Sequence, residues 1–484
     1  MRPGVAARNI DAMTIDDIPV LVVGAGPAGL AAAIELSRHD IPCLLIERRT
    51  ELSSHPRATV LSLRSMELVR AWGLERAVRA RSADVDPRML EAETLADAAA
   101  GTPIAVGYPS AEESRMVSPT APACIAQDDV EPLLLEHLRG MPLAQVALGT
   151  ELIGILAGSD GARAELRDVR TGALRAIRAR YVVAADGARS AVRRALGVAL
   201  IGPEHLMVGS TTLFRAPLWN VVGDHRHLLY SVTHATTPAV FLPAGPGDRW
   251  LVGFLELGAE SPSDRRAAAL IRVAAGVPDL PVAIEQSRSF SAAAQLAERW
   301  RSDSVLLAGD AAHRVTPRGG TGLNLALHDG YDVGWRLGWV LRGWAGPRLL
   351  DSYEAERRPI VEYTAERSAD PSGSRRAAEQ EVRADVGARI PHAWAGDRST
   401  LDLLAPGLTL FAAHGRRAWE PAAASLPAGV PVAVRRLDPV AARAIGAPGG
   451  SALLARSDGT PVGVLPAGAE PLPALRAAVA AATG

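Results

Sequence analysis

Residues 18–47 read IPVLVVGAGPAGLAAAIELSRHDIPCLLIE. The apolar run at 20–23 predicts a buried strand, the alanine-rich segment at 28–38 predicts a helix, and residues 43–47 predict a second strand. A strand, a glycine turn, a helix and a strand within about thirty residues form a βαβ unit of a doubly wound parallel sheet. This stretch therefore predicts an α/β fold.

The turn of this unit has the spacing GxGxxG, in Gly24-Ala25-Gly26-Pro27-Ala28-Gly29. Gly24 permits the tight turn, Gly26 lets a diphosphate approach the backbone, and Gly29 lets the helix pack closely on the strand. The helix N-terminus then faces the phosphates with its partial positive charge. Glu47 ends the second strand about eighteen residues later, where it would accept hydrogen bonds from ribose hydroxyls and would repel the extra phosphate of NADP. The turn therefore predicts a dinucleotide site that does not hold NADP.

Two further apolar strands, YVVAADG (181–187) and SVLLAGD (304–310), end on acids. Asp310, after Gly309, lies where such sheets bind ligands and could bind sugar-like hydroxyls. The Asp186-Gly187 pair could do the same, although such a pair after a strand is as often only a turn.

A second glycine turn, Gly319-Gly320-Thr321-Gly322, follows Asp310 and opens a helical segment. Its N–H groups, that of Gly320 among them, would face an anion or the carbonyl edge of a ring. FAD combines a diphosphate, a polyhydroxyl chain and a ring that becomes anionic on reduction. The sequence therefore predicts FAD as the ligand, with Gly320 facing the N1–C2=O edge of the ring.

The composition excludes several other classes. The chain has 484 residues, 48% of them hydrophobic, and a formal net charge of -1, so nothing steers it toward nucleic acid or an anionic membrane. Cys43 and Cys124 are the only cysteines, without metal-type spacing, which fits a reducing cytoplasm. Lysine is absent, which excludes Schiff-base chemistry. No run is long enough to span a membrane, and residues 1–17 are expected to be a disordered leader.

Taken together, these motifs resemble the para-hydroxybenzoate hydroxylase-type FAD-dependent aromatic monooxygenases, in the three-domain branch of phenol and aromatic-polyketide hydroxylases. The resemblance rests on GAGPAG, Glu47-Arg48, HPRA (55–58), Asp186-Gly187 and GDAAH…P…GG…GLN (309–324). It implies non-covalent FAD, NAD(P)H as a transient co-substrate, and oxygen transfer to an aromatic ring through a hydroperoxide at flavin C4a. The substrate would be a small aromatic molecule, and the protein a monomer or homodimer.

The resemblance also implies a domain division and further site residues. Residues 18–80, 110–195 and 285–385 would form a Rossmann-like FAD-binding domain, and residues 81–109 and 196–284 an antiparallel β-layer that binds the substrate. Residues 386–484 would form a thioredoxin-like domain, which lacks cysteine and so cannot do dithiol chemistry. Asp186 would support both the FAD site and NAD(P)H use. The other implied contacts to FAD come from Arg48, Arg57, Gln127, Pro317, Gly320, Gly322, Leu323 and Asn324.

Several alternatives remain open. Baeyer–Villiger insertion could use the same cofactor, a non-catalytic flavin-binding module is possible, and flavin-dependent halogenation is disfavoured because it needs a pocket lysine. Pro317 and Gly320 are assigned to framing the ring, and no acid, base or metal ligand is assigned. We expect His313 to be a packed loop residue, Trp335 and Trp339 to be core, and the arginines of AERRP (355–359) to lie on a solvated helix face. One long helix is expected from Leu323 to Pro359.

Overall fold

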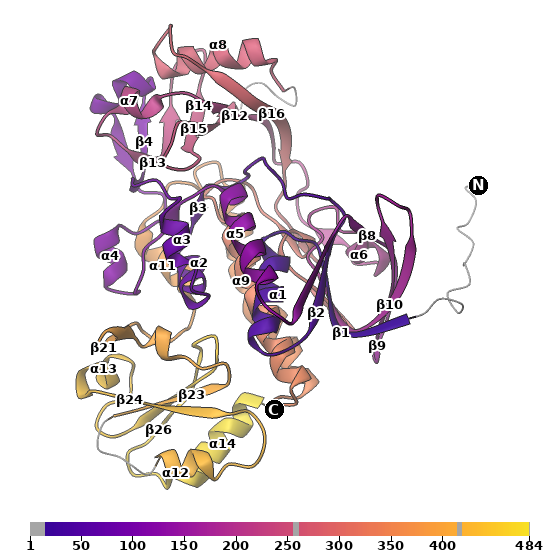
Figure 1. Cartoon of the computed structure of the whole chain (residues 1–484). Helices are drawn as coiled ribbons and strands as arrows, with labels where there is room; N and C mark the ends of the chain where they lie inside the picture. The colour runs from indigo at the N-terminus through magenta and orange to yellow at the C-terminus, as the bar shows by residue number, and fades with distance from the viewer. Residues whose placement is uncertain (1–14, 255–260, 414–418, 484) are drawn as a thin grey trace.

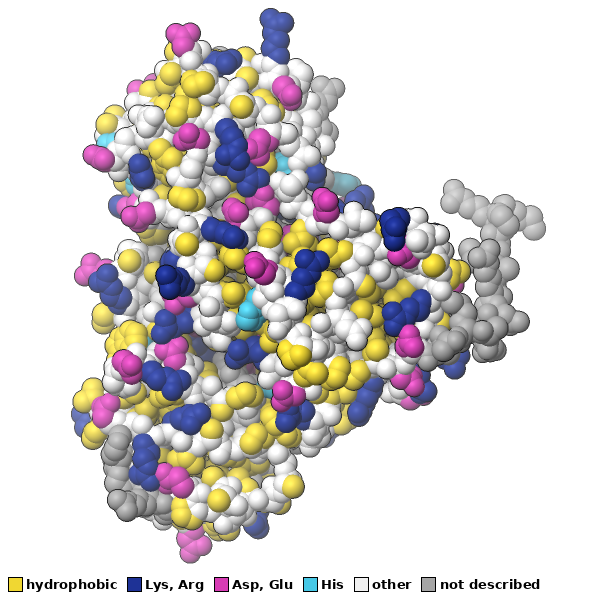
Figure 2. Space-filling view, viewed as in Figure 1, with side chains coloured by type: hydrophobic (Ala, Val, Ile, Leu, Met, Phe, Trp, Pro, Cys, Tyr) yellow, Lys and Arg dark blue, Asp and Glu magenta, His cyan; other side chains and the backbone are white. Residues whose placement is uncertain are grey.

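The computed structural model describes residues 15–254, 261–413 and 419–483. Figure 1 shows a central α/β layer, a β-rich lobe above it and a C-terminal lobe below it. Arginines and acidic side chains alternate over the face seen in Figure 2, and no patch of one sign dominates it. No described helix is long and apolar enough to cross a membrane.

The central sheet is built around the predicted βαβ unit, β1 (Ile15–Val23), α1 (Pro27–Arg38) and β2 (Cys43–Glu47). Its main order is β18-β19-β10-β1-β2-β7, with parallel pairing from β19 to β7. A ribbon formed by β8 and β9 extends from the first half of β10. The remaining strands of this sheet are β7 (Ala144–Leu148), β8 (Thr150–Gly158), β9 (Gly161–Asp168), β10 (Leu174–Ala184), β18 (Arg301–Ser302) and β19 (Val305–Leu307). The leader boundary at residue 17 is therefore wrong, because β1 begins at Ile15; residues 1–14 lie outside the described part.

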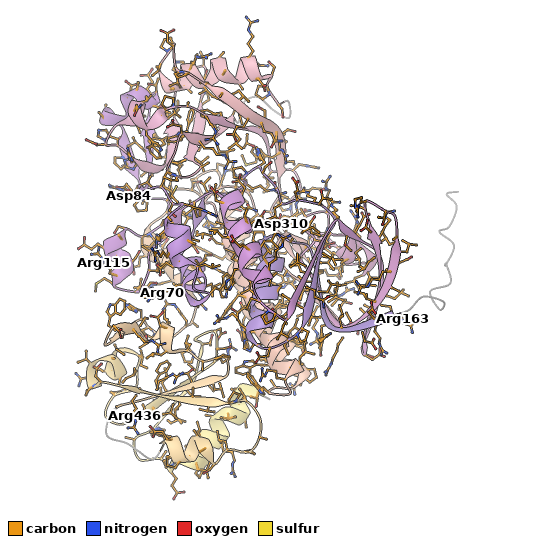
Figure 3. The ribbon with its side chains drawn as sticks, in the orientation of Figure 1. Arg70, Asp84, Arg115, Arg163, Asp310 and Arg436 are labelled. Carbon is orange, nitrogen blue, oxygen red and sulfur yellow. The ribbon has the colours of Figure 1, made fainter. Side chains whose placement is uncertain are left out.

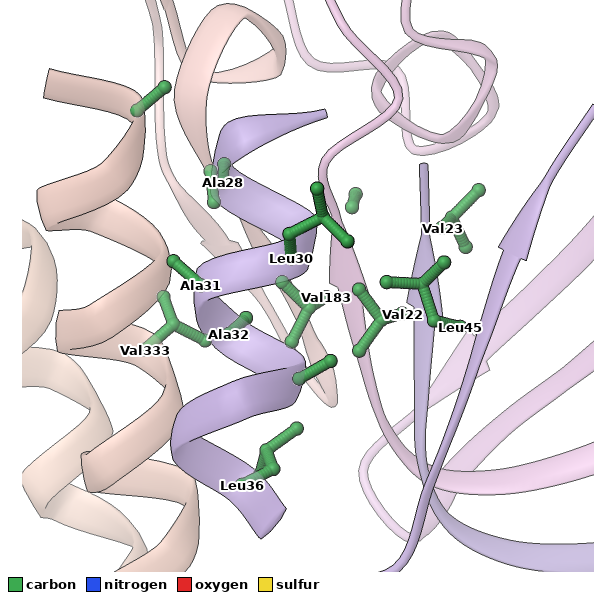
Figure 4. Close-up of a cluster of buried hydrophobic side chains, with 14 of the residues drawn as sticks. Val22, Val23, Ala28, Leu30, Ala31, Ala32, Leu36, Leu45, Val183 and Val333 are labelled. Atoms are coloured by element: carbon green, nitrogen blue, oxygen red, sulfur yellow. The ribbon is translucent and has the colours of Figure 1, made fainter. Parts of the chain in front are cut away.

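The helix α1 is held between this sheet and α9 (Gly322–Leu341), as Figure 4 shows. Gly330, Gly334 and Gly338 lie one helical turn apart on α9 and face α1. A Cβ atom added at Gly330 would lie 2.1 Å from the Ala28 carbonyl oxygen, and one at Gly334 would lie 2.6 Å from Glu35 Cβ. The two helices therefore approach more closely than a side chain at these three positions would permit.

The upper lobe is a seven-stranded sheet in the order β16-β12-β15-β14-β13-β4-β5, antiparallel except for the pair β13 and β4. One face carries the aromatic core of this lobe, with Phe214, Phe241 and Trp250 buried against α7, α8 and η2. The domain boundary expected at residue 284 falls inside β16, because this strand stays paired with β12 as far as Ala292. The elements are β4 (Asp86–Ala92), η2 (Leu95–Ala100), β5 (Thr102–Ile104), β12 (Met207–Arg215), α7 (Leu218–Val222), β13 (His227–Val232), β14 (Ala239–Pro243), β15 (Arg249–Phe254), α8 (Asp264–Ala275) and β16 (Ala283–Ala292).

The C-terminal lobe has a four-stranded sheet in the order β24-β23-β25-β26, with β23 and β24 parallel. Trp335 and Trp339 of α9 are fully buried in its core, as expected for core residues. The elements of the lobe are β21 (Trp394–Ala395), β22 (Arg398–Ser399), η5 (Leu401–Leu403), β23 (Leu408–Ala413), α12 (Trp419–Ala424), β24 (Val432–Leu437), α13 (Pro439–Ala444), β25 (Ala452–Ala455), β26 (Pro461–Leu465) and α14 (Pro471–Thr483).

The single helix expected from Leu323 to Pro359 is two helices, α9 and α10 (Asp351–Ala369), joined through η4 (Pro347–Leu350). Pro359 lies inside α10 and does not end it. Its ring is on the exposed face, so water can bind the carbonyl group that loses its partner. The remaining elements are β3 (Val60–Leu61), α2 (Leu63–Ala71), α3 (Glu75–Arg79), α4 (Ala111–Arg115), β6 (Ala123–Cys124), α5 (Gln127–Arg139), α6 (Ala191–Ala195), β11 (Leu200–Ile201), β17 (Gln295–Ala297), η3 (Gly309–Ala311), β20 (His313–Arg314) and α11 (Ala378–Val386).

Candidate functional site

The predicted motifs converge because four parallel strands end at the same level of the central sheet. Val23 of β1 pairs with Ile46 of β2 and with Ala184 of β10, and Ala184 pairs with Leu307 of β19. Each motif starts within three residues of its strand end, so the glycine turn, Glu47, Asp186 and Asp310 share one edge. Figure 3 shows Asp310 at the upper end of the central layer, below the β-rich lobe. The carboxyl edge of a parallel sheet is the usual place for a ligand.

The first glycine turn leaves its backbone open to a ligand. Gly24 has φ +107°, and a Cβ atom there would lie 2.4 Å from the Ala185 carbonyl oxygen. A Cβ atom on Gly29 would lie 1.9 Å from the Gly24 carbonyl oxygen, so this residue lets helix and strand approach. A Cβ atom on Gly26 would meet no protein atom within 4 Å, although Gly26 immediately precedes α1. The turn thus exposes its backbone at a helix N-terminus, and this arrangement fits a diphosphate.

Glu47 lies beside this glycine turn. Its Oε2 atom accepts a hydrogen bond from the Ala25 N–H at 3.1 Å, and its Oε1 atom accepts one from the Arg49 N–H at 3.0 Å. The carboxylate keeps lone pairs free for hydroxyl donors. This position suits the ribose contact expected for Glu47, which stays a prediction.

Asp310 lies in η3 with its side chain half-buried, and no described residue forms a hydrogen bond with its carboxylate. A partly buried carboxylate without a protein partner suits a ligand that donates hydroxyl protons. It could therefore bind the ribityl chain of FAD.

The segment that carries Asp310 is held by Asp329 of α9, a residue that the sequence analysis missed. Asp329 is fully buried and accepts hydrogen bonds from the Gly309 N–H at 3.0 Å, from His313 Nε2 at 2.5 Å and from Arg357 Nε at 3.0 Å. Burial raises the pKa of Asp329, but the charges of His313 and Arg357 outweigh this effect and bring the pKa to about 2. Asp329 therefore stays ionised and fixes the strand end.

This network confirms one expectation and corrects another. His313 is 1% exposed and packed, as expected. Arg357 of AERRP was expected on a solvated helix face but is 5% exposed. It is buried because it neutralises Asp329, a carboxylate in a distant part of the sequence.

Asp186 takes part in a turn and keeps one carboxylate oxygen without a partner among the described residues. Its Oδ2 atom accepts hydrogen bonds from the N–H groups of Ala191 and Val192 at 2.7 and 3.1 Å, so it caps α6 as part of a turn. Its Oδ1 atom is buried and has no partner among the described residues. A buried oxygen without a donor is rare, and a ligand or a water molecule could satisfy it. The structure thus shows the turn and leaves the ligand role a prediction.

The HPRA loop and Gln127 are brought together by the short pair β3 and β6. The Gln127 N–H donates to the Ala58 carbonyl at 2.9 Å, and its side chain donates to Glu131 Oε1 at 2.7 Å. Burial raises the pKa of Glu131. This residue was not predicted from the sequence. Arg48 and Arg57 are exposed and have no described hydrogen-bond partner. Both arginines are therefore free to contact an anionic ligand.

The second glycine turn corrects the donor that the sequence suggested. The Gly320 N–H donates to the Pro317 carbonyl at 3.0 Å and is not available to a ligand. The N–H groups of Thr321, Gly322 and Leu323 have no acceptor in the described chain, since they belong to the first turn of α9. Asn324 instead ties this turn to β3, through its Oδ1 atom 2.8 Å from the Ser62 N and its Nδ2 atom 3.2 Å from the Val60 carbonyl oxygen. The free donors suit the electron-rich edge of a ring.

Comparisons with known proteins agree with this geometry. A family model described as FAD binding domain matches residues 17–368. A putative polyketide hydroxylase of Streptomyces coelicolor is 38% identical over 360 residues, which are 73% of this chain and 57% of that relative. The tetracenomycin A2 monooxygenase-dioxygenase of Streptomyces glaucescens is 33% identical over 494 residues, with 87% of each chain covered. The structure of aklavinone-11 hydroxylase with FAD and aklavinone matches with a TM-score of 0.84 and 29% identity, over 97% of this chain and all (100%) of that one.

Proposed function

The chain belongs to the FAD-dependent aromatic hydroxylases that carry this FAD-binding domain, and we propose that it transfers one oxygen atom from O₂ to a polycyclic phenol or polyketide. Its cofactor is FAD, and NAD(P)H is the reductant. The observation that carries the proposal is an uncharged patch in the middle of one face of the upper sheet, between Arg288 of β16 and Glu91 of β4, beside the expected flavin contacts.

This face is defined by the pairing of the strands. Thr211, Gly253, Val240 and Ser231 stand side by side across β12, β15, β14 and β13. All four are half-buried and uncharged. In the neighbouring row, Leu213, Leu251 and Leu242 pack against Ala126 of the central layer. Because residues two apart share a face, both rows look toward the central layer.

The HPRA loop connects this face, which is the proposed substrate wall, to the expected flavin site. His55 is 6% exposed, and its Nε2 atom lies 3.3 Å from Thr211 Oγ1. Two residues later, Arg57 is exposed and is the residue expected to contact the flavin. A mostly apolar wall next to the expected position of the flavin would suit a planar aromatic substrate, and pockets at domain interfaces are common.

The chain's own contribution is to bind and to orient. When bound and reduced, the flavin supplies the activation of O₂. Gly26 and the N-terminus of α1 would hold its diphosphate, and Asp310 would hold the ribityl hydroxyls. The N–H groups of Thr321, Gly322 and Leu323 would stabilise negative charge that develops at the ring edge on reduction. The wall of the upper sheet would hold the aromatic ring and exclude water.

The proposal is tested by screening polycyclic phenols and quinones for faster NAD(P)H consumption under ¹⁸O₂. We expect a product that has gained one ¹⁸O atom on an aromatic carbon. Insertion of ¹⁸O beside a ketone would instead establish Baeyer–Villiger chemistry. Peroxide as the only product with every stimulating compound would contradict the monooxygenase proposal.

A further inference from the structure

The side chains of Tyr108 and Arg376 bind carbonyl groups of the second glycine turn. The Tyr108 hydroxyl lies 3.2 Å from the Gly319 carbonyl oxygen and 3.3 Å from that of Gly320. Arg376 Nη2 lies 3.3 Å from the same Gly319 oxygen. Tyr108 follows β5 and Arg376 precedes α11, so neither belongs to the sequence motifs of the FAD site. Both approach the turn from one side.

These contacts orient two peptide groups. In a planar trans peptide, the C=O of one residue and the N–H of the next point in opposite directions. The Gly320 carbonyl faces Tyr108, and it also accepts from Asn324 Nδ2 at 3.2 Å. The Thr321 N–H, in the same peptide group, must therefore point away from the side chains of Tyr108 and Asn324. It is one of the donors that have no acceptor in the described chain.

The two side chains are themselves held firmly. Arg376 is ion-paired with Glu381 at 2.7 Å, and its Nη2 atom also donates to the Val106 carbonyl at 2.7 Å. The side chains of Arg376 and Glu381 are only 7% and 11% exposed. Burial raises the pKa of Tyr108, so its hydroxyl stays protonated and remains a donor. A backbone bridge between Val106 and Arg376 joins the two segments.

We propose that Tyr108 and Arg376 are positioning residues that aim the Thr321 N–H at the N1–C2=O edge of the flavin ring. Tyr108 binds the Gly320 carbonyl, on the opposite side of this peptide from the Thr321 N–H, and Arg376 fixes the preceding peptide through the Gly319 carbonyl. The Thr321 N–H would then meet the charge that appears on reduction. This contact is stronger in the reduced flavin than in the oxidised one, so it raises the reduction potential. The inference rests on the placement of the ring at this turn.

Tyr108→Phe is the direct test, because it removes one hydroxyl without changing a charge. We expect the variant to bind reduced FAD about tenfold less tightly relative to oxidised FAD, which is a potential lower by about 30 mV for a two-electron couple. The pH at which the reduced flavin takes up a proton, followed by its absorbance, should rise. Amide exchange should show that FAD protects the Thr321 N–H in the wild-type chain and protects it less in the variant.

Tyr230→Phe is the matched control, since it removes another buried phenolic hydroxyl, one that donates to the His225 carbonyl at 3.0 Å in the upper lobe. It should leave the potential unchanged. If Tyr108→Phe does not hold FAD, Arg376→Lys replaces it, because this variant keeps the charge and loses the guanidinium fork. A wild-type potential in a FAD-loaded Tyr108→Phe or Arg376→Lys variant would overturn the inference. An unprotected Thr321 N–H in the wild-type holoenzyme would instead show that the ring does not lie at this turn.

Discussion

Gly26 has open space where a side chain would stand, and this property allows a sharp test. Gly26→Val should fold normally, because the added atoms meet no protein neighbour, but they would occupy the expected position of the diphosphate. We expect the purified variant to be colourless and to regain less than about a tenth of the wild-type FAD content on reconstitution.

Gly346→Val is the control for this variant. Gly346 has φ -72° and ψ 163°, close to the extended backbone of Gly26, and a Cβ atom there also meets nothing within 4 Å. Circular dichroism should show both variants folded, and only Gly26→Val should lose FAD. Stoichiometric FAD in Gly26→Val would place the diphosphate elsewhere.

Gly253 is the gap in the proposed substrate wall. A Cβ atom there comes no closer than 3.9 Å to the protein, so Gly253→Leu would fill the space of the substrate without straining the sheet. We expect kcat/KM for hydroxylation to fall about 100-fold, with FAD content and substrate-free NAD(P)H oxidation unchanged. The control is Gly463→Leu on β26, where a Cβ atom also meets nothing within 4 Å and activity should persist. Equal activity in both variants would remove Gly253 from the wall.

At this scale, the sequence predicted residues whose role depends on their near neighbours. Gly29 is required by its contact with Gly24, five residues earlier, so the spacing of the two glycines was enough to predict it. Asp329 and Arg357 were missed because each is explained only by the other, across two helices that the sequence did not place together. The Gly320 N–H was wrongly taken as free, because its bond to Pro317 depends on the exact course of the turn.

At the scale of elements, the contact between α1 and α9 joins the two glycine turns. Replacing a helical glycine by alanine usually stabilises a helix by about 0.5–1 kcal/mol. Gly330→Ala should do the opposite and lower the free energy of unfolding by about 1–3 kcal/mol, because its Cβ atom would lie 2.1 Å from the Ala28 carbonyl oxygen. Urea unfolding of the FAD-free protein measures this change.

Gly322→Ala is the control in the same helix. Its Cβ atom would be 3.6 Å from Val315 Cγ2, an ordinary contact, so its stability should stay equal or rise. If Gly330→Ala were as stable as Gly322→Ala, the close approach of α1 and α9 would be disproved.

At the scale of the whole molecule, Trp335 and Trp339 join the C-terminal lobe to the central layer. Trp339 is fully buried, and its Nε1 atom donates to the Pro406 carbonyl at 2.9 Å. Trp339→Ala should therefore cost about 3–5 kcal/mol and lower the melting temperature of the whole chain in a single transition. Trp394→Ala, at a site that is 51% exposed, should change stability by less than about 0.5 kcal/mol. Independent melting of the two parts in calorimetry would contradict a shared core.

The sequence predicted the strands of each layer better than the places where one element or layer gives way to the next. Alternating and continuous apolar runs indicated the central strands, the upper sheet and the C-terminal strands. The domain boundary expected at residue 284 falls inside β16, and the break between α9 and α10 was not predicted, because both depend on the pairing and packing of distant segments. The division into three domains stays a proposal.

The helix α9 has 20 residues and is therefore roughly 30 Å long. It starts at the second glycine turn and ends among the tryptophans of the C-terminal lobe. One rigid helix therefore belongs both to the central layer and to the C-terminal lobe, two parts that could otherwise be exchanged. This limits recombination between related enzymes. A chimera that takes its last hundred or so residues from a relative must also bring a cavity for both indole rings and an acceptor for Trp339 Nε1. We therefore expect productive crossovers to lie before Gly322, so that α9 and the cavity that holds its two tryptophans come from the same parent.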